Sequence, residues 1–201
     1  ESSAICLNKI ATKRILSACG VPTPPFHVLD GSISASRSPF GFPDVVKPAR
    51  LGSTVGISIV KRKADLLPAV RRARRYDRDV LLERFIAGTE ITIGVIGNDR
   101  LRILPAIEIR TPTGFYDYHA KYIPGGSTHI IPPRLPARVV KRAQGEAARA
   151  FRILGCAGMA RMEMIVDGGG TPFILDVNTI PGFTRTSLFP EAAAAAGISF
   201  G

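Results

Sequence analysis

The stretch ARMEMIVDGGGTPFILDVNTIPG, residues 160–182, places three glycines between two runs in which apolar and polar side chains alternate. Alternation with a period of two is typical of β-strands. Asp-Gly-Gly-Gly is a strong turn signal between two such runs. The stretch therefore predicts an antiparallel hairpin with a loop of about four residues.

One face of this hairpin is expected to be polar. In a register that opposes Val166 to Phe173, four polar side chains share that face: Arg161, Glu163, Asp176 and Asn178. Two carboxylates side by side repel each other, and the simplest interpretation is an outer face in water. Two carboxylates and a carboxamide are also hard oxygen donors of the kind that hold Mg²⁺ together with waters and phosphates. The hairpin alone leaves both interpretations open.

The composition describes a globular chain of 201 residues, 45% of them hydrophobic, which fits one large domain or two small lobes. No apolar run approaches the ~20 residues of a membrane span, and the N-terminus lacks a signal-peptide pattern, so we expect a cytoplasmic chain that contacts no membrane. Cys6, Cys19 and Cys156 lack metal-type spacing, which favours reduced, buried thiols.

The net charge of +11 comes largely from arginines such as the run RRARR at residues 71–75. Nucleic acid is one class of partner for such a charge. Leu66, Val70 and Ala73 fall at helical spacing through the run, so the arginines are better interpreted as the solvent-exposed face of an amphipathic helix. A basic cleft that binds anionic nucleotides would also account for the positive charge, so we expect no nucleic-acid partner.

The remaining patterns predict a mixture of helices and largely antiparallel strands, an α+β fold. Helices are expected near residues 7–18, 66–73 and 143–154. Strands are expected at residues 26–29, 45–46 and 57–60 and from residues 80, 90 and 102, with residues 112–136 mostly in loops.

Candidate binding groups lie around the second predicted hairpin. The loop RLGSTVG, residues 50–56, could close on an anion through backbone N–H groups and hydroxyls, although it is not a Walker A loop. Lys47 stands amid apolar neighbours, where a lysine is costly to bury unless an anion meets it. Glu83 and Glu90 lie in or between apolar strands, where an ion-paired structural carboxylate and a ligand are both reasonable.

Taken in order, several segments resemble the ATP-grasp part of the D-alanine–D-alanine ligase family, from about Asn8 to Phe200. The matching segments are NKIATKRILSACGVPTPP, VVKPARLGSTVGIS, LLERFIAGTEITIGVIG, LPAIEI, FYDYHAKY, RMEMIV and LDVNTIPGFTRTSLFPEAA. The resemblance implies an ATP-grasp fold of two α+β lobes with the nucleotide between them. It implies a small lobe at about residues 1–86 and a large lobe at residues 87–201 with the metal and substrate site.

The resemblance also implies roles for individual residues. ATP, the co-substrate, would be bound by Lys9, Lys47, Ser53, Glu83, Arg84, Phe85, Ile86, Glu90 and Lys121. Mg²⁺ or Mn²⁺, as two ions, would be held by Glu163, Asp176 and Asn178. Catalysis would involve Arg161, which stabilises the tetrahedral intermediate, together with Ser53, Tyr122 and the backbone N–H of Gly182. The second D-alanine would meet Gly182, Ser187 and Leu188.

The sequence departs from the family pattern at several points. Asn8 replaces an aspartate, Thr54 replaces a serine, and the metal pair is exchanged: the family has Asp then Glu where this chain has Glu163 then Asp176. The family also has an N-terminal domain before Asn8 that helps to hold the first D-alanine, and a final helix after the last residue here. We therefore expect an excised chain that binds Mg²⁺–ATP but by itself makes no dipeptide at a useful rate.

The implied activity is the ATP-dependent ligation of two D-alanines through an acyl phosphate, for peptidoglycan precursor synthesis. One alternative is a related ligase that joins another acid and amine, and another is a nucleotide-binding fragment without catalysis. The expected partners are the small molecules ATP and D-alanine, and a homodimer stays open.

Overall fold

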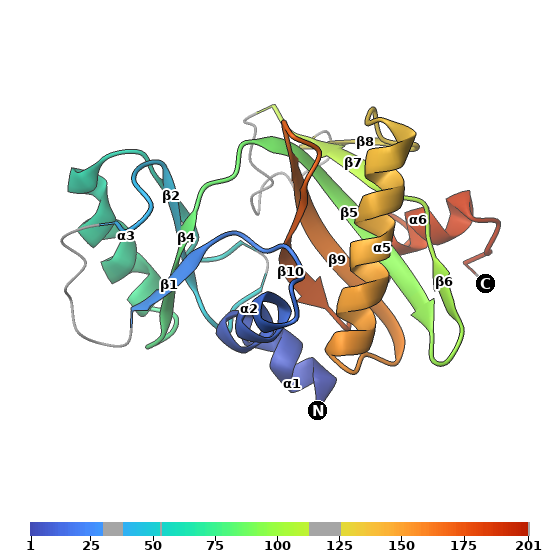
Figure 1. Cartoon of the computed structure of the whole chain (residues 1–201), viewed down its shortest axis with the longest axis horizontal. Coiled ribbons are helices and arrows are strands. Elements are labelled where there is room, and N and C mark those ends of the chain that lie inside the picture. The colour runs from blue at the N-terminus through green and yellow to red at the C-terminus, as the bar shows by residue number, and fades with distance from the viewer. Residues whose placement is uncertain (30–37, 53, 113–125, 201) are drawn as a thin grey trace.

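The strands form two antiparallel sheets in a computed structural model that describes residues 1–29, 38–52, 54–112 and 126–200 (Figure 1). The four-stranded sheet has the order β1-β4-β2-β3, and the six-stranded sheet has the order β10-β9-β5-β7-β8 with β6 beside β5. The strands of the first sheet are β1 (Phe26–Leu29), β2 (Asp44–Pro48), β3 (Ser58–Val60) and β4 (Val80–Arg84). Those of the second are β5 (Gly88–Gly97), β6 (Leu101–Ile103), β7 (Ile107–Arg110), β8 (Thr128–Ile130), β9 (Gly158–Asp167) and β10 (Pro172–Asn178). With helices packed on both sheets, the predicted α+β class is confirmed.

Helix α3 (Lys63–Arg74) covers the four-stranded sheet. Its buried residues are Leu66, Ala69, Val70 and Ala73, which pack against apolar residues of β2, β3 and β4. Arg71 and Arg72 are exposed, as expected for the wet side of an amphipathic helix.

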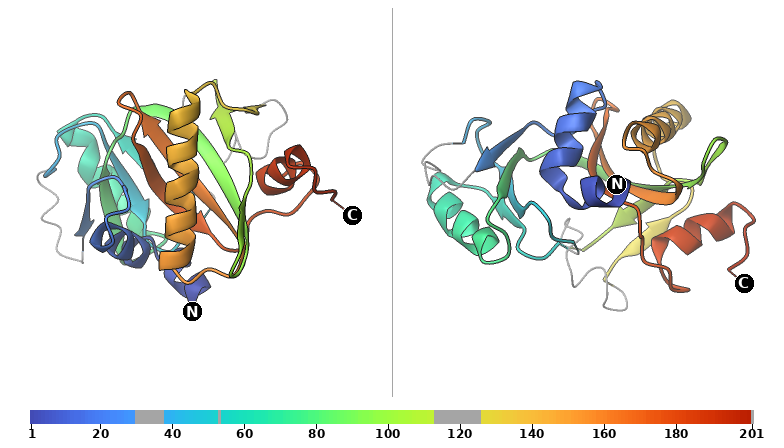
Figure 2. Two further views of the ribbon diagram at one scale, coloured as in Figure 1. Left: turned by 45° about the vertical axis from the view of Figure 1, so that its right-hand side comes forward. Right: turned by 90° about the horizontal axis from the view of Figure 1, so that it is seen from below.

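The six-stranded sheet has helices on both faces (Figure 2). Helix α5 (Ala137–Ile153) packs on one face, where it meets alternate residues of β5 and β9 such as Ile93 and Met162. Helix α6 (Leu188–Ala195) packs through Leu188 and Phe189 on residues of β7 and the segment before it. Because side chains alternate along a strand, the β9 residues between those under α5 point to the opposite face.

The N-terminal segment forms two helices, α1 (Ser2–Leu7) and α2 (Lys9–Ala18), where the sequence predicts one. The break falls at Asn8, whose side chain accepts hydrogen bonds from the backbone N–H groups of Ile10 and Ala11 and so caps α2. Helix α2 contacts both sheets: Leu16 joins the core of the larger one, while Ile10 packs near β4. The lobe boundary near residue 86 stays a prediction.

The hairpin at residues 160–178 is present, with a four-residue loop between β9 and β10. Glu163 opposes Asp176, as predicted, but Phe173 opposes Ile165 and not Val166. The register shifts between Ile174 and Asp176, where the extra residue in β10 forms a bulge.

Two further strand predictions differ from the structure. The strand expected from residue 102 onward divides into β6 and β7 around Pro105, which has no N–H to donate to a ladder. The segment expected to be mostly loop contains β8, and residues 113–125 within it lie outside the described residues. None of the helices in the described parts of the chain is long and apolar enough to cross a membrane.

Candidate functional site

A cavity of about 360 Å³ lies between the two sheets. It is lined from the small sheet by β2 and β4, and from the large sheet by β5, β8, β9 and β10. The predicted site residues on its wall are Lys9, Lys47, Glu83, Arg84, Phe85, Ile86, Glu90, Arg161, Glu163, Asp176, Asn178, Gly182, Ser187 and Leu188. Ser53, Lys121 and Tyr122 lie outside the described residues.

The polar face of the hairpin forms one wall of this cavity. The Arg161 guanidinium donates to Glu163 at 2.6 Å, and both side chains are largely buried. The Nε atom of Arg161 is buried and has no hydrogen-bond partner among the described residues. This face is therefore the wall of a cavity, and the interpretation as a fully solvated outer face is wrong.

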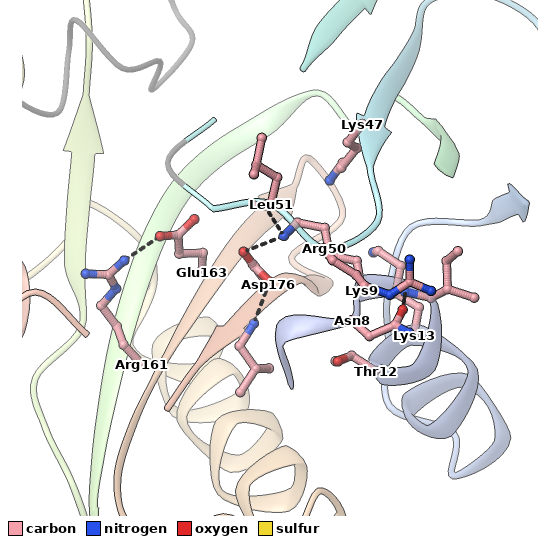
Figure 3. A network of polar contacts seen from close by, with 12 residues as sticks. Asn8, Lys9, Thr12, Lys13, Lys47, Arg50, Leu51, Arg161, Glu163 and Asp176 are labelled. Carbon is pink, nitrogen blue, oxygen red and sulfur yellow. Dashed lines mark hydrogen bonds and ion pairs between the residues drawn. The ribbon is translucent and has the colours of Figure 1, made fainter. Parts of the chain in front are cut away.

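Lys9, the first residue of α2, reaches the same wall from the N-terminal segment (Figure 3). Its Nζ donates to the carbonyl oxygen of Leu51 at 2.8 Å and lies 3.3 Å from Asp176 Oδ2. The side chain is 6% exposed, although lysine is almost never fully buried unless paired. The structure thus joins Asp176 to a buried ammonium group.

A second buried cluster contains Lys13, Lys47 and Glu83. Lys47 Nζ lies 2.7 Å from Glu83 Oε2, and Lys13 Nζ lies 3.1 Å from Glu83 Oε1. Burial lowers the pKa of Lys13 from 10.5 to about 8, against the raising effect of Glu83. Burial would raise the pKa of Glu83, but the charges of Lys13 and Lys47 outweigh it and hold that pKa below its ordinary value. Glu83 is therefore an ionised carboxylate shared by two lysines.

The chemistry of the hairpin face fits a divalent cation. Glu163 and Asp176 are cross-strand partners, and Asn178 follows on the same strand. Among the described residues, no group of three or more His, Cys, Asp or Glu side chains could hold a metal ion by itself, so a cation here would also need Asn178 and ligands from outside the chain. Two carboxylates and one carboxamide leave coordination positions for water and phosphate oxygens, which is the usual arrangement for Mg²⁺. The Asn178 oxygen accepts one bond, from the N–H of Ile180 at 3.0 Å, and keeps a second lone pair.

The segment between β10 and α6 forms a compact hydroxyl cluster at the cavity. The Ser187 Oγ accepts from the Thr184 N–H at 3.0 Å and lies 2.8 Å from the Thr184 Oγ1. A Cβ added at Gly182 would lie 3.1 Å from Ser187 Oγ, so a glycine allows this close approach.

Sequence reasoning missed two groups in this region. Lys13 was one, although it stands four residues after Lys9 on the same helix face, where two like charges repel unless an anion meets them. His129 of β8 was the other, and it lines the cavity with Nδ1 2.6 Å from Glu191 Oε2. Its sequence neighbours gave no signal for this role.

Comparison with known proteins identifies the family of this chain. A family model described as D-ala D-ala ligase C-terminus matches residues 15–201. The chain belongs to the D-alanine–D-alanine ligase family. Its two-sheet α+β architecture is the ATP-grasp fold expected from the sequence.

Curated relatives of this family match almost the whole chain. The D-alanine–D-alanine ligase of Moorella thermoacetica is 46% identical over 208 residues, which cover 99% of this chain and 67% of that protein. The D-alanine–D-alanine ligase of Desulforudis audaxviator is 48% identical over 204 residues, covering 99% of this chain and 66% of that protein. The chain thus spans about two thirds of the length of these relatives.

Solved structures of family members superpose on the same region. The VanG D-Ala:D-Ser ligase from Enterococcus faecalis has a TM-score of 0.86 and 32% identity, covering 99% of this chain and 60% of that one. The D-alanine–D-alanine ligase from Bacillus anthracis complexed with ATP has a TM-score of 0.84 and 32% identity, covering 99% and 63%.

Proposed function

We propose that this chain supplies the nucleotide, metal and catalytic groups of an ATP-dependent D-alanine–D-alanine ligase that makes a peptidoglycan precursor. The observation that carries the proposal is the convergence of Lys9, Lys47 and Arg161 with Glu163 and Asp176 on one cavity. Cations suit a triphosphate, and paired carboxylates suit its metal ion. The nucleotide would lie between the lobes at residues 1–86 and 87–201.

The proposed reaction has two steps. A carboxylate oxygen of the first D-alanine attacks the γ-phosphorus of ATP, the bond from that phosphorus to ADP breaks, and an acyl phosphate forms. The amine of the second D-alanine then attacks the acyl carbon, loses a proton, and displaces inorganic phosphate. Positioning and charge stabilisation supply most of the rate in such transfers.

The residues of this chain have distinct parts in that scheme. Lys9 and Lys47 bind phosphate oxygens, while Glu90 and the segment 83–86 hold the nucleoside. Arg161, with its Nε unpaired among the described residues, stabilises negative charge on the tetrahedral intermediate together with the N–H of Gly182. Ser187 and Leu188 bind the second amino acid.

Glu163, Asp176 and Asn178 would hold two divalent cations, either Mg²⁺ or Mn²⁺. When bound, these cations would neutralise the charge of the triphosphate. Ser53, Lys121 and Tyr122 would complete the nucleotide and substrate contacts.

A second candidate is the same chemistry with a different amine. A D-Ala:D-Ser ligase superposes on this chain as well as a D-alanine–D-alanine ligase does, with TM-scores of 0.86 and 0.84 and the same 32% identity, so the fold is compatible with either amine. The hydroxyl cluster of Thr184, Thr186 and Ser187 beside the cavity could also meet a hydroxyl-bearing amino acid.

The test uses the protein at its natural length, with Mg²⁺, ATP and a panel of D- and L-amino acids. Phosphate release and mass spectrometry of the product identify the acid and the amine. We expect D-alanyl-D-alanine; a mixed dipeptide with D-serine would favour the second candidate. ATP binding without any dipeptide would reduce the proposal to nucleotide binding.

The proposal places the reaction in the cytoplasm without a nucleic-acid partner. Analytical ultracentrifugation would test whether the protein forms a homodimer.

A further inference from the structure

Lys13 lies behind the cavity wall, not on it. It is 1% exposed and is not among the described residues that line the cavity. Its Nζ donates to Thr23 Oγ1 at 2.6 Å, and Thr23 in turn donates to the carbonyl oxygen of Ile174 at 2.9 Å. Lys13 is thus held on one side by the strand that carries Asp176.

On its other side Lys13 meets Glu83, which does line the cavity. Glu83 uses one carboxylate oxygen for Lys13 and the other for Lys47. The β2–β4 register opposes Val45 to Glu83, so Lys47 is the diagonal neighbour of Glu83 on the same face. The carboxylate therefore connects a lysine outside the wall with a lysine on it.

The charges of this cluster decide what Lys47 can offer to an anion. Two ammonium groups and one carboxylate leave one positive charge, whereas Lys47 and Glu83 alone would be neutral. Asp176 adds a more distant negative charge to the surroundings of Lys13, and it is itself paired with Lys9 at 3.3 Å. Without Lys13, a buried Glu83 would hold Lys47 by itself.

We propose that Lys13 is a positioning residue for the nucleotide: by pairing with one oxygen of Glu83, it leaves on Lys47 a positive charge available to the phosphates of ATP. The inference rests on the proposed function, because it requires Lys47 to meet phosphate. It differs from a purely structural role, in which Lys13 would only fill the space behind β4. Burying an ammonium group is costly, and an apolar side chain would fill that space at lower cost.

The experiment measures the dissociation constants of Mg²⁺–ATP and of adenosine. The variants are Lys13→Met, Lys13→Gln, Glu83→Gln and the double variant Lys13→Met/Glu83→Gln, with Lys141→Met on the exposed side of α5 as control. Lys13→Gln removes the charge but keeps a donor for Thr23, and circular dichroism checks the folding of each variant.

We expect ATP binding to weaken by about tenfold or more in both Lys13 single variants, since one charge-assisted contact is lost. Adenosine carries no phosphate, so its affinity should stay within about twofold. The double variant removes the carboxylate as well and restores one net positive charge. Because Glu83 also lies in the segment proposed to hold the nucleoside, the comparison uses the ratio of ATP to adenosine affinity, which should return to within about threefold of the wild-type ratio.

Three outcomes would overturn the inference. Unchanged ATP affinity in a folded Lys13 variant would show that Lys47 does not depend on Lys13. Equal losses for ATP and adenosine in the Lys13 variants would assign Lys13 a packing role, and so would a double variant whose ratio of ATP to adenosine affinity is no better than that of Lys13→Met. A wild-type chain that binds adenosine but not Mg²⁺–ATP would overturn both this inference and the proposed function.

Discussion

Glu163 and Asp176 are direct cross-strand partners on β9 and β10, yet each carboxylate is paired with a different cation. Arg161 from the same strand meets Glu163 at 2.6 Å, and Lys9 from α2 meets Asp176 at 3.3 Å. Neighbouring carboxylates repel, so these two cations relieve the repulsion within the hairpin. The two carboxylates thus lie side by side on the cavity wall, where they could bind one cation together.

The first prediction concerns the exchanged pair at these positions. Glu163→Asp leaves two short side chains and Asp176→Glu leaves two long ones, whereas Mg²⁺ requires near-octahedral geometry at about 2.0–2.1 Å. Each single variant should therefore raise the Mg²⁺ concentration needed for ATP turnover. The double variant should recover much of the loss, because residues that share one ion are coupled by ~0.5–3 kcal/mol.

This is checked by titrating Mg²⁺ in the protein at its natural length, with a Mg²⁺-induced shift in melting temperature as a readout that needs no turnover. Strictly additive effects of the two changes would mean that Glu163 and Asp176 share no metal ion.

The second prediction concerns Lys47. Lys47→Ala removes a buried cation from the cavity, and we expect Mg²⁺–ATP binding to weaken by about 1.5–3 kcal/mol, as for a charge-assisted hydrogen bond. Glu83 keeps Lys13 as a partner at 3.1 Å, so the variant should still fold. Calorimetry measures the affinity, with the exposed Lys61→Ala as the matched control. Equal affinities for the two variants would remove Lys47 from the site.

The hairpin shows how far its sequence pattern could predict the fold. Period-two alternation predicted both strands and the opposition of Glu163 to Asp176, because the polar residues sit at matched distances from the turn. It could not locate the bulge, because one extra residue in β10 shifts the alternation by one position for all residues after it. Ile174 before the bulge and Val177 after it are both buried although they are three residues apart, a spacing that strict alternation does not allow.

The residues of the candidate site were predicted less completely than the strands of the fold. The family resemblance named the residues on the cavity wall, because motifs report groups that touch ligands. Lys13 was missed because the spacing of Lys9 and Lys13 hints at an anion but does not show that α2 packs against β4, the long-range contact that brings Glu83 to Lys13. His129 was missed for a similar reason, as its partner Glu191 lies 62 residues away.

The third prediction concerns Gly88, where β5 begins. A Cβ at this position would lie 2.0 Å from the carbonyl oxygen of Val166, a backbone atom of the paired strand β9. Gly88→Ala should therefore force the strands apart and lower the free energy of unfolding by about 1–3 kcal/mol. Gly145→Ala is the matched control, because nothing lies within 4 Å of a Cβ there and alanine favours the helix.

Thermal and urea denaturation would compare the two glycine variants. We expect a lower midpoint for Gly88→Ala and an equal or higher one for Gly145→Ala. Equal stability of Gly88→Ala and the wild type would show that β5 and β9 tolerate a wider separation at this end.

The last prediction is a pH dependence that separates nucleotide binding from folding stability. Burial lowers the pKa of Lys13 from 10.5 to about 8 in the folded protein. Between these two values the unfolded chain binds more protons at Lys13 than the folded chain does, so this group makes the free energy of unfolding rise with pH in that window. The affinity for ATP should instead fall as the pH rises, because a neutral Lys13 leaves Glu83 to neutralise Lys47.

The dissociation constant for Mg²⁺–ATP should therefore increase in the wild type from about pH 7 to about pH 9.5. The increase should be much smaller in Lys13→Met, in which this charge is absent at every pH. Parallel curves for the two proteins would assign the pH dependence to other groups and would contradict the coupling of Lys13 to Lys47 through Glu83.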